Sequence, residues 1–138
     1  MEHILTERVT NTRQLGVGYV FYLIDRSSDK ERLYPILGEV SEIYKDEGRW
    51  GFKFKDIARQ GHCREFSYKT MDEWMAGGVQ VYRVYGFDID KDDPKEVMDY
   101  IHKKTLPNHM DTCRECDNDF EIFELTINGY CYDCSYGE

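Results

Sequence analysis

Long hydrophobic runs, an excess of basic charge and known catalytic motifs are all missing from this 138-residue chain. Its most apolar stretch, residues 17–24, is far shorter than the ~18 residues that a membrane-spanning helix needs. The N-terminus is polar and does not resemble a secretory signal, so we expect a cytoplasmic protein. Because no hydrolase, zinc-protease or kinase motif occurs, we expect a function without catalysis.

Basic residues are too few to offset the acidic ones. Lys and Arg number 18 against 27 Asp and Glu, which gives a formal net charge of −9 and a pI near 4.9. Proteins that bind nucleic acid through their overall charge present a basic face to the phosphates. This composition therefore argues against a general nucleic-acid-binding protein and favours a protein partner with a basic surface.

Cysteine is scarce over most of the chain and concentrated near its end, where four of the five cysteines form two Cys-x-x-Cys pairs. The odd number and the paired spacing favour metal-binding thiolates in a reducing compartment over disulfides. The predicted metal ligands are Cys113, Cys116, Cys131 and Cys134. Four thiolates suit a structural Zn²⁺, since they leave no open position for water, and iron is the alternative metal.

The segment between the two pairs predicts a hairpin. Residues 119–125 are rich in apolar side chains, Asn128-Gly129 is a typical turn pair, and residues 130–132 lead into the second cysteine pair. This order of turn, hairpin and turn resembles the zinc ribbon, or rubredoxin-like, module, and the resemblance covers residues 113–138. The glycine that usually follows each pair is replaced by Asp117 and Ser135. A treble-clef finger would need a helix after Cys134, where only four residues remain.

The predicted metal module is strongly acidic. Residues 113–138 contain seven carboxylates, and Arg114 is their only basic residue. We expect this segment to dock on a basic partner through Glu115, Asp117, Asp119, Glu121 and Glu124. Electrostatic complementarity of this kind speeds association and sets specificity. The chain would then be a regulatory factor, or an accessory or viral factor, that acts on nucleic-acid machinery.

The first part of the chain predicts an α+β fold. Turns separate short segments of strand character. The predicted strands are 3–10, 17–24, 36–45, 49–57, 62–68 and 79–87. Helices are expected after a capping box that starts at Thr70 and over residues 94–105. Tight turns predict a mostly antiparallel curved sheet or a small barrel, and a single mixed sheet is the alternative. The predicted domains are 1–90, a helix and linker at 91–110, and the metal module at 111–138.

One region supports an alternative function in nucleic-acid binding. Residues 49–64 combine aromatic side chains with basic ones, of which Arg49, Lys53, Lys55 and Arg59 are the candidate phosphate contacts. The aromatics alternate with the cations along the strand, which places the aromatics in a core and the cations in solvent. We therefore favour a packed strand with a solvated face over a binding surface.

Two further residues carry reactive groups. Cys63 lies between His62 and Arg64. Adjacent residues on a strand point to opposite faces, so His62 is poorly placed as the base of Cys63. We expect Cys63 to be structural. His109 precedes the first cysteine pair by four residues and is expected to be a surface residue. The alternatives are that it replaces one of the metal ligands or lies beside them.

Overall fold

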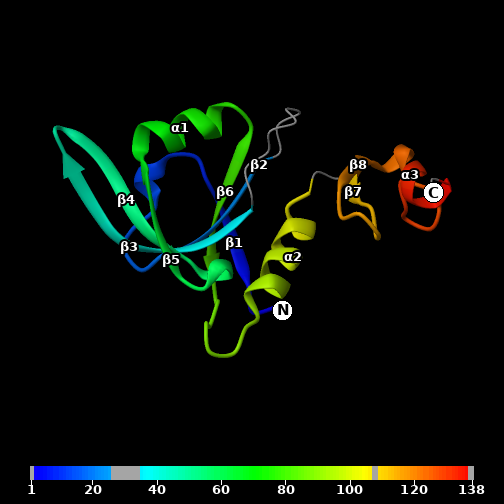
Figure 1. Ribbon diagram of the computed structural model, residues 1–138, viewed down its shortest axis with the longest axis horizontal. Coiled ribbons are helices and arrows are strands. Elements are labelled where there is room, and N and C mark those ends of the chain that lie inside the picture. The colour runs from blue at the N-terminus through cyan, green and yellow to red at the C-terminus, as the bar shows by residue number, and fades with distance from the viewer. Residues whose placement is uncertain (1, 26–34, 107–108, 137–138) are drawn as a thin grey trace. The chain divides into compact units, whose positions relative to one another are not determined.

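The computed structural model describes residues 2–25, 35–106 and 109–136, and the chain forms two compact units, Met1–Asp99 (unit 1) and Tyr100–Glu138 (unit 2) (Figure 1). Unit 1 contains an antiparallel sheet in the order β1-β6-β2-β3-β4-β5. Its strands are β1 (Leu5–Val9), β2 (Val20–Asp25), β3 (Ile36–Asp46), β4 (Arg49–Asp56), β5 (His62–Ser67) and β6 (Val79–Tyr85). The predicted α+β class is confirmed. The sheet is open, with β1 and β5 at its edges, so the small barrel was the wrong alternative.

A cluster of buried aliphatic and phenylalanine side chains forms the core on one face of the sheet of unit 1. Phe21 of β2 packs edge to face against Phe54 of β4, with ring centroids 5.2 Å apart. Gly38 of β3 pairs directly with Phe21, and a Cβ at Gly38 would lie 2.8 Å from both rings. The glycine therefore lets the two rings meet. The full cluster is Val9, Leu15, Phe21, Leu23, Ile36, Val40, Phe52, Phe54, Met71, Val79 and Val81.

The long β3–β4 hairpin shows why the sheet curves. Glu47 and Gly48 form its tight turn with φ angles of 49° and 81°, a conformation that matches the twist of the flanking strands. Between Val40 and Glu42 the pairing register shifts, so Ser41 forms a bulge and donates to the Lys53 carbonyl at 3.2 Å. Bulges bend the strand and increase its twist.

Helix α1 (Tyr68–Ala76) packs on this core through Met71, which is fully buried. The helix starts earlier than the predicted box at Thr70. Ser67 is its N-cap, and the Ser67 hydroxyl accepts from the Thr70 amide at 3.1 Å. The Thr70 box was therefore the wrong start, because Ser67 occupies the N-cap position and places Thr70 inside the first turn. The helix ends at Ala76, and Gly77 is its C-cap.

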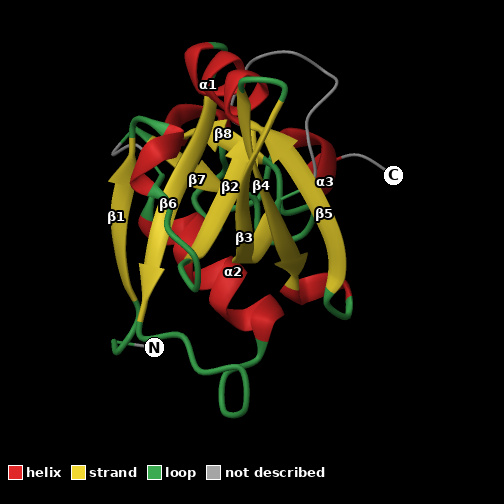
Figure 2. Ribbon diagram, turned by 90° about the vertical axis from the view of Figure 1, so that its left-hand side faces the viewer, coloured by secondary structure: helices red, strands yellow, loops and turns green. Residues whose placement is uncertain are grey.

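Two further helical segments complete unit 1. The 3₁₀ helix η1 (Thr12–Gln14) follows β1, and η2 (Ile57–Arg59) follows β4. Helix α2 (Pro94–Lys104) starts at the predicted proline and runs into unit 2. Figure 2 shows the sheet of unit 1 by secondary structure. Residues 26–34, between β2 and β3, and residues 107–108, which belong to the predicted linker, lie outside the described residues.

Unit 2 differs from the predicted hairpin. Strand β8 (Asp119–Glu121) is short and pairs with β7 (Met110–Thr112), which lies before the first cysteine pair. The chain then turns into the 3₁₀ helix η3 (Ile122–Glu124), and Leu125 and Cys131 form an isolated β-bridge across the Asn128-Gly129 turn. Helix α3 (Tyr132–Tyr136) contains Cys134. The strand predicted over 119–125 is wrong beyond residue 121, and the second cysteine pair lies at a helix instead of a second turn.

Candidate metal centre

The fold brings the four predicted ligands together. Cys113 follows β7, Cys116 lies in the turn before β8, Cys131 directly precedes α3, and Cys134 is inside that helix. Their Sγ atoms all lie within 4.8 Å of one another, and those of Cys116 and Cys131 are 3.8 Å apart. Four sulfurs at about 2.3 Å from one tetrahedral ion are separated by roughly 3.8 Å. The donor set and its spacing therefore fit a single four-coordinate metal ion.

The first pair is held by a turn between β7 and β8. The Asp117 amide donates to the Cys113 carbonyl at 3.1 Å, and the Cys113 amide donates to the Asn118 carbonyl at 2.9 Å. Asp117 takes the left-handed conformation, with φ of 59°, where a glycine is usual. Aspartate is among the residues that tolerate this region. The missing glycine therefore does not prevent the turn.

The second pair needs no glycine for a different reason. The Ser135 amide donates to the Cys131 carbonyl at 2.9 Å, which is the hydrogen bond of a helical turn. Because the pair is helical, no left-handed residue has to follow Cys134.

The Asn128-Gly129 turn fixes the two pairs against each other. The Arg114 amide donates to the Gly129 carbonyl at 3.0 Å. Gly129 has φ of 84°, and a Cβ there would lie 2.9 Å from Nε of Arg114. The turn thus lies against the Arg114 side chain next to the first ligand, and its positive φ favours glycine at this position.

The polypeptide stabilises one sulfur as a thiolate. Burial by itself would raise the pKa of Cys113, but the amides of Cys116, Cys131 and Glu115 donate to its sulfur and lower its pKa to about 6. The Cys131 amide approaches that sulfur at 3.3 Å. Amide donors of this kind favour the charged form of a metal-binding cysteine.

Two of the other sulfurs, those of Cys116 and Cys134, are harder to ionise without a cation. The Asn118 amide lowers the pKa of Cys116, yet desolvation and the neighbouring thiols outweigh it and the pKa is raised. The hydrogen bond with Cys131, followed by burial, raises the pKa of Cys134 strongly. Four adjacent thiolates repel one another, so a divalent cation is the group that would let all of them ionise.

A polar cluster that the sequence analysis missed supports the β7–β8 pair. Nε2 of His102, from the end of α2, lies 2.8 Å from Oδ1 of Asp119, and the Thr112 hydroxyl donates to the same oxygen at 3.0 Å. The Asp119 side chain is only 8% exposed. Asp119 was predicted as a docking residue, and the structure places its carboxylate in contacts within unit 2. No sequence signal links a histidine and an aspartate 17 residues apart.

The other predicted docking acids differ in their surroundings. Glu115 and Asp117 are exposed in the first cysteine turn. Glu121 and Glu124 form a reciprocal capping box at η3, in which the Glu121 amide donates to Glu124 Oε2 at 3.2 Å. Glu124 remains exposed, whereas Glu121 is half-buried.

Unit 2 exposes several large apolar side chains. The exposed fraction is 53% for Ile122, 81% for Phe123 and 102% for Ile127. A hollow of about 310 Å³ lies beside the cysteine cluster. Its lining consists of Phe120, Phe123, Glu124, Cys131, Tyr132 and Asp133.

The basic residues of the nucleic-acid alternative do not gather into one stripe. Lys53 lies opposite Glu42 and Glu65 on the adjacent strands, and its Nζ is 3.6 Å from Glu42. Lys55 lies opposite Glu39. Across this face, acids and bases therefore alternate.

Arg59 has a structural role. Its guanidinium lies 3.2 Å from Asp56, whose side chain is fully buried, and also donates to the Pro35 carbonyl at 3.3 Å. Arg64 approaches the same carboxylate at 3.4 Å. These contacts hold the end of β4. Arg49, from the same predicted set, lines a hollow of unit 1.

The two remaining candidates are surface residues. Cys63, which was predicted to be structural, is an exposed free thiol on the edge strand β5. His109 is 67% exposed, and its Nε2 lies 3.6 Å from Glu121. Its partner is therefore a carboxylate.

Comparison with known proteins gives no further guidance: no family model, curated protein or solved structure matches this chain. None of the described helices is long and apolar enough to span a membrane. Fold and site together define an α+β protein with a four-cysteine cluster that could hold a metal ion.

Proposed function

We propose that this protein is a non-enzymatic interaction protein in which a metal-stabilised unit binds a basic segment of a protein partner. The observation that carries this proposal is the hollow beside the cysteine cluster, where aromatic and acidic side chains line the same space. Exposed apolar surface bordered by polar groups is typical of protein-binding sites.

The lining chemistry suits a lysine or arginine side chain. Phe123 and Tyr132 are 81% and 65% exposed, so their rings are accessible to the aliphatic part of such a side chain. A cation above an aromatic ring gains about 0.5–1 kcal/mol at exposed sites. The carboxylates of Glu124 and Asp133 supply the complementary charge.

The metal in this proposal is structural zinc, held by Cys113, Cys116, Cys131 and Cys134. Four thiolates fill a tetrahedral shell, so the ion would stabilise the fold and bind no substrate. Cys131 lines the hollow and directly precedes Tyr132, which connects metal binding to the shape of the docking surface. In this sense the unit would act as a ribbon-like module, with its second pair on a helix.

The partner we propose is a basic protein, such as a component of nucleic-acid machinery, and the protein would act on it as a regulatory or accessory factor. Glu115 and Asp117 are exposed and add to the negative field of unit 2. Such a field raises association rates and repels phosphate backbones.

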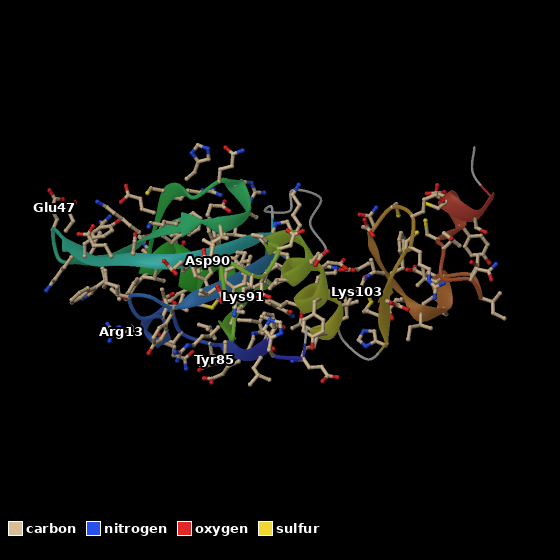
Figure 3. All side chains as sticks on the ribbon, turned by 90° about the horizontal axis from the view of Figure 1, so that it is seen from below. Arg13, Glu47, Tyr85, Asp90, Lys91 and Lys103 are labelled. Atoms are coloured by element: carbon tan, nitrogen blue, oxygen red, sulfur yellow. The ribbon has the colours of Figure 1, made fainter. Side chains whose placement is uncertain are left out.

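A lysine-rich decapeptide tests the docking surface on the full, metal-loaded chain. We expect NMR shift changes at Phe120, Phe123 and Tyr132, and about tenfold weaker binding for Glu124→Gln combined with Asp133→Asn. The matched control replaces two exposed acids of unit 1, Glu47→Gln with Asp90→Asn (Figure 3), and should bind as the wild type does. Equal losses in both double variants, or no shifts in unit 2, would contradict the proposal.

A further inference from the structure

Unit 1 carries two adjoining hollows where the start of α1, the β3–β4 hairpin and η1 meet. Their volumes are about 260 and 420 Å³, and both are lined by Arg13, Trp50 and Tyr68. The smaller hollow also contains Arg49, Ser67, Lys69 and Asp72, and the larger one contains Leu15, Gly16 and Ile43. Basic and aromatic side chains therefore surround one continuous region.

Two aromatic rings form a platform in this region. The rings of Trp50 and Tyr68 are stacked, with centroids 6.4 Å apart and an interplanar angle of 23°. Trp50 is 43% exposed, although the next two aromatics of its strand, Phe52 and Phe54, are buried. The aromatic face of β4 thus extends out of the core and ends at the solvent, where a planar ligand can stack on it.

The charge of this region is opposite to that of the whole protein. Arg13, Arg49 and Lys69 are exposed, and none of them forms an ion pair with a carboxylate in the part of the chain that the structure describes. Asp72 is the acidic residue of the lining. Its Oδ1 accepts from the Thr12 hydroxyl at 2.6 Å and from the Thr12 amide at 3.2 Å, so this carboxylate serves the fold.

Arg13 is positioned by a rigid turn. The side chain of Asn11 caps η1 and accepts from the Arg13 amide at 2.9 Å, while Gln14 Oε1 accepts from the Thr10 amide at 2.8 Å. The contact between Thr12 and Asp72 fastens the turn to α1. Figure 3 shows Arg13 extending outward from the ribbon. Burial raises the pKa of Tyr68 and the charge of Arg13 partly lowers it, which agrees with their closeness.

We propose that this region binds a nucleotide unit, with the base against Trp50 and Tyr68 and the phosphate near Arg13 and Lys69. Aromatic rings bind every base through its π-face, and arginine side chains bind phosphate through paired N–H donors. This site shares only Arg49 with the cations predicted from the strand pattern. The same chemistry serves a free mononucleotide or one nucleotide of a single strand, and it is independent of the docking surface on unit 2.

Calorimetric titration of the full, metal-loaded chain with adenosine 5′-monophosphate, adenosine, inorganic phosphate and a decathymidylate tests this assignment. We expect the monophosphate or the decathymidylate to bind, and adenosine and phosphate alone to bind at least about tenfold more weakly, because each supplies half of the contacts. Arg13→Ala and Trp50→Leu should each weaken binding about tenfold. Lys69→Ala should weaken it less, and Lys91→Ala, an exposed lysine outside the site, should leave it unchanged.

The outcomes distinguish a free mononucleotide from a single strand as the ligand, and they show when the proposal fails. Binding of the monophosphate identifies a mononucleotide site, whereas binding of the decathymidylate alone, with a salt dependence, identifies a single-strand site. Either result supports the proposal if Arg13→Ala and Trp50→Leu reduce it while circular dichroism shows a folded chain. Absence of binding for both, or equal binding by wild type, Arg13→Ala and Trp50→Leu, would overturn it.

Discussion

Replacing Cys131 with serine should unfold unit 2 and leave unit 1 intact. Among the described residues of unit 2, the buried apolar side chains are Ile101, Cys113 and Cys131, so two of the three are proposed metal ligands. Burial of one isoleucine contributes about 1.5–3 kcal/mol. A structural zinc site contributes roughly 10–16 kcal/mol. Unit 2 therefore depends on the metal far more than on its apolar contacts.

Amide NMR spectra of the metal-loaded wild type and of Cys131→Ser measure this directly. We expect residues 109–136 to lose their dispersed signals, while the strands of unit 1 keep theirs because their core contains no cysteine. Cys63→Ser is the matched control, since this thiol is exposed and outside the cluster. Dispersed signals for Phe120 and Gly129 in Cys131→Ser would refute the reasoning.

Three further results are expected. Gly38→Ala should destabilise unit 1 by about 1–3 kcal/mol in urea unfolding, because its Cβ would overlap Phe21 and Phe54; a wild-type midpoint would contradict the packing. Phe54→Ala should lower the free energy of unfolding of unit 1 by about 3–5 kcal/mol without changing the metal content. Phe123→Ala should leave stability nearly unchanged, because Phe123 is 81% exposed. Zinc binding at pH 7 should release at least two protons, since the pKa values of Cys116 and Cys134 are raised, and the zinc affinity should fall as the pH is lowered. Calorimetry in buffers of different ionisation enthalpy counts the released protons. A zinc affinity that does not depend on pH would argue against thiolate ligands.

The strands of unit 1 were largely predictable from local pattern. In β4 the alternation of Phe52 and Phe54 with Lys53 and Lys55 predicted the buried and exposed faces, as observed. Strand β2 begins at Val20 instead of Val17, because the Tyr19 amide donates to the Gly16 carbonyl and Gly18 takes a positive φ. The apolar residues of 17–24 did not reveal this turn, since hydrophobicity does not determine backbone direction.

The metal module was predictable in its ligands and less so in its backbone. Cysteine spacing identified the four sulfurs that meet. The apolar residues of 119–125 suggested a strand, yet Phe123 is 81% exposed and Ile122 begins a 3₁₀ helix. Apolar residues are buried only where their segment packs against a hydrophobic core. Here Ile122 and Phe123 lie on the surface of unit 2.

Contacts distant in sequence could not be predicted. The pairing of His102 with Asp119 joins α2 to β8, and the contact of Asp72 with Thr12 spans 60 residues. Both depend on how elements pack after they form. The basic-aromatic region of unit 1 was missed for the same reason, since Arg13, Trp50 and Tyr68 come from three separate segments.

The metal content of the purified chain tests the central claim most directly. Elemental analysis under reducing conditions, combined with thiol titration, should find one zinc per chain and Cys63 as the reactive thiol, with the other four cysteines protected until a chelator is added. Cys113→Ser should lose most of that zinc. Iron in place of zinc would contradict the structural role, and a metal-free chain with a disulfide among the four cysteines would contradict the metal centre itself.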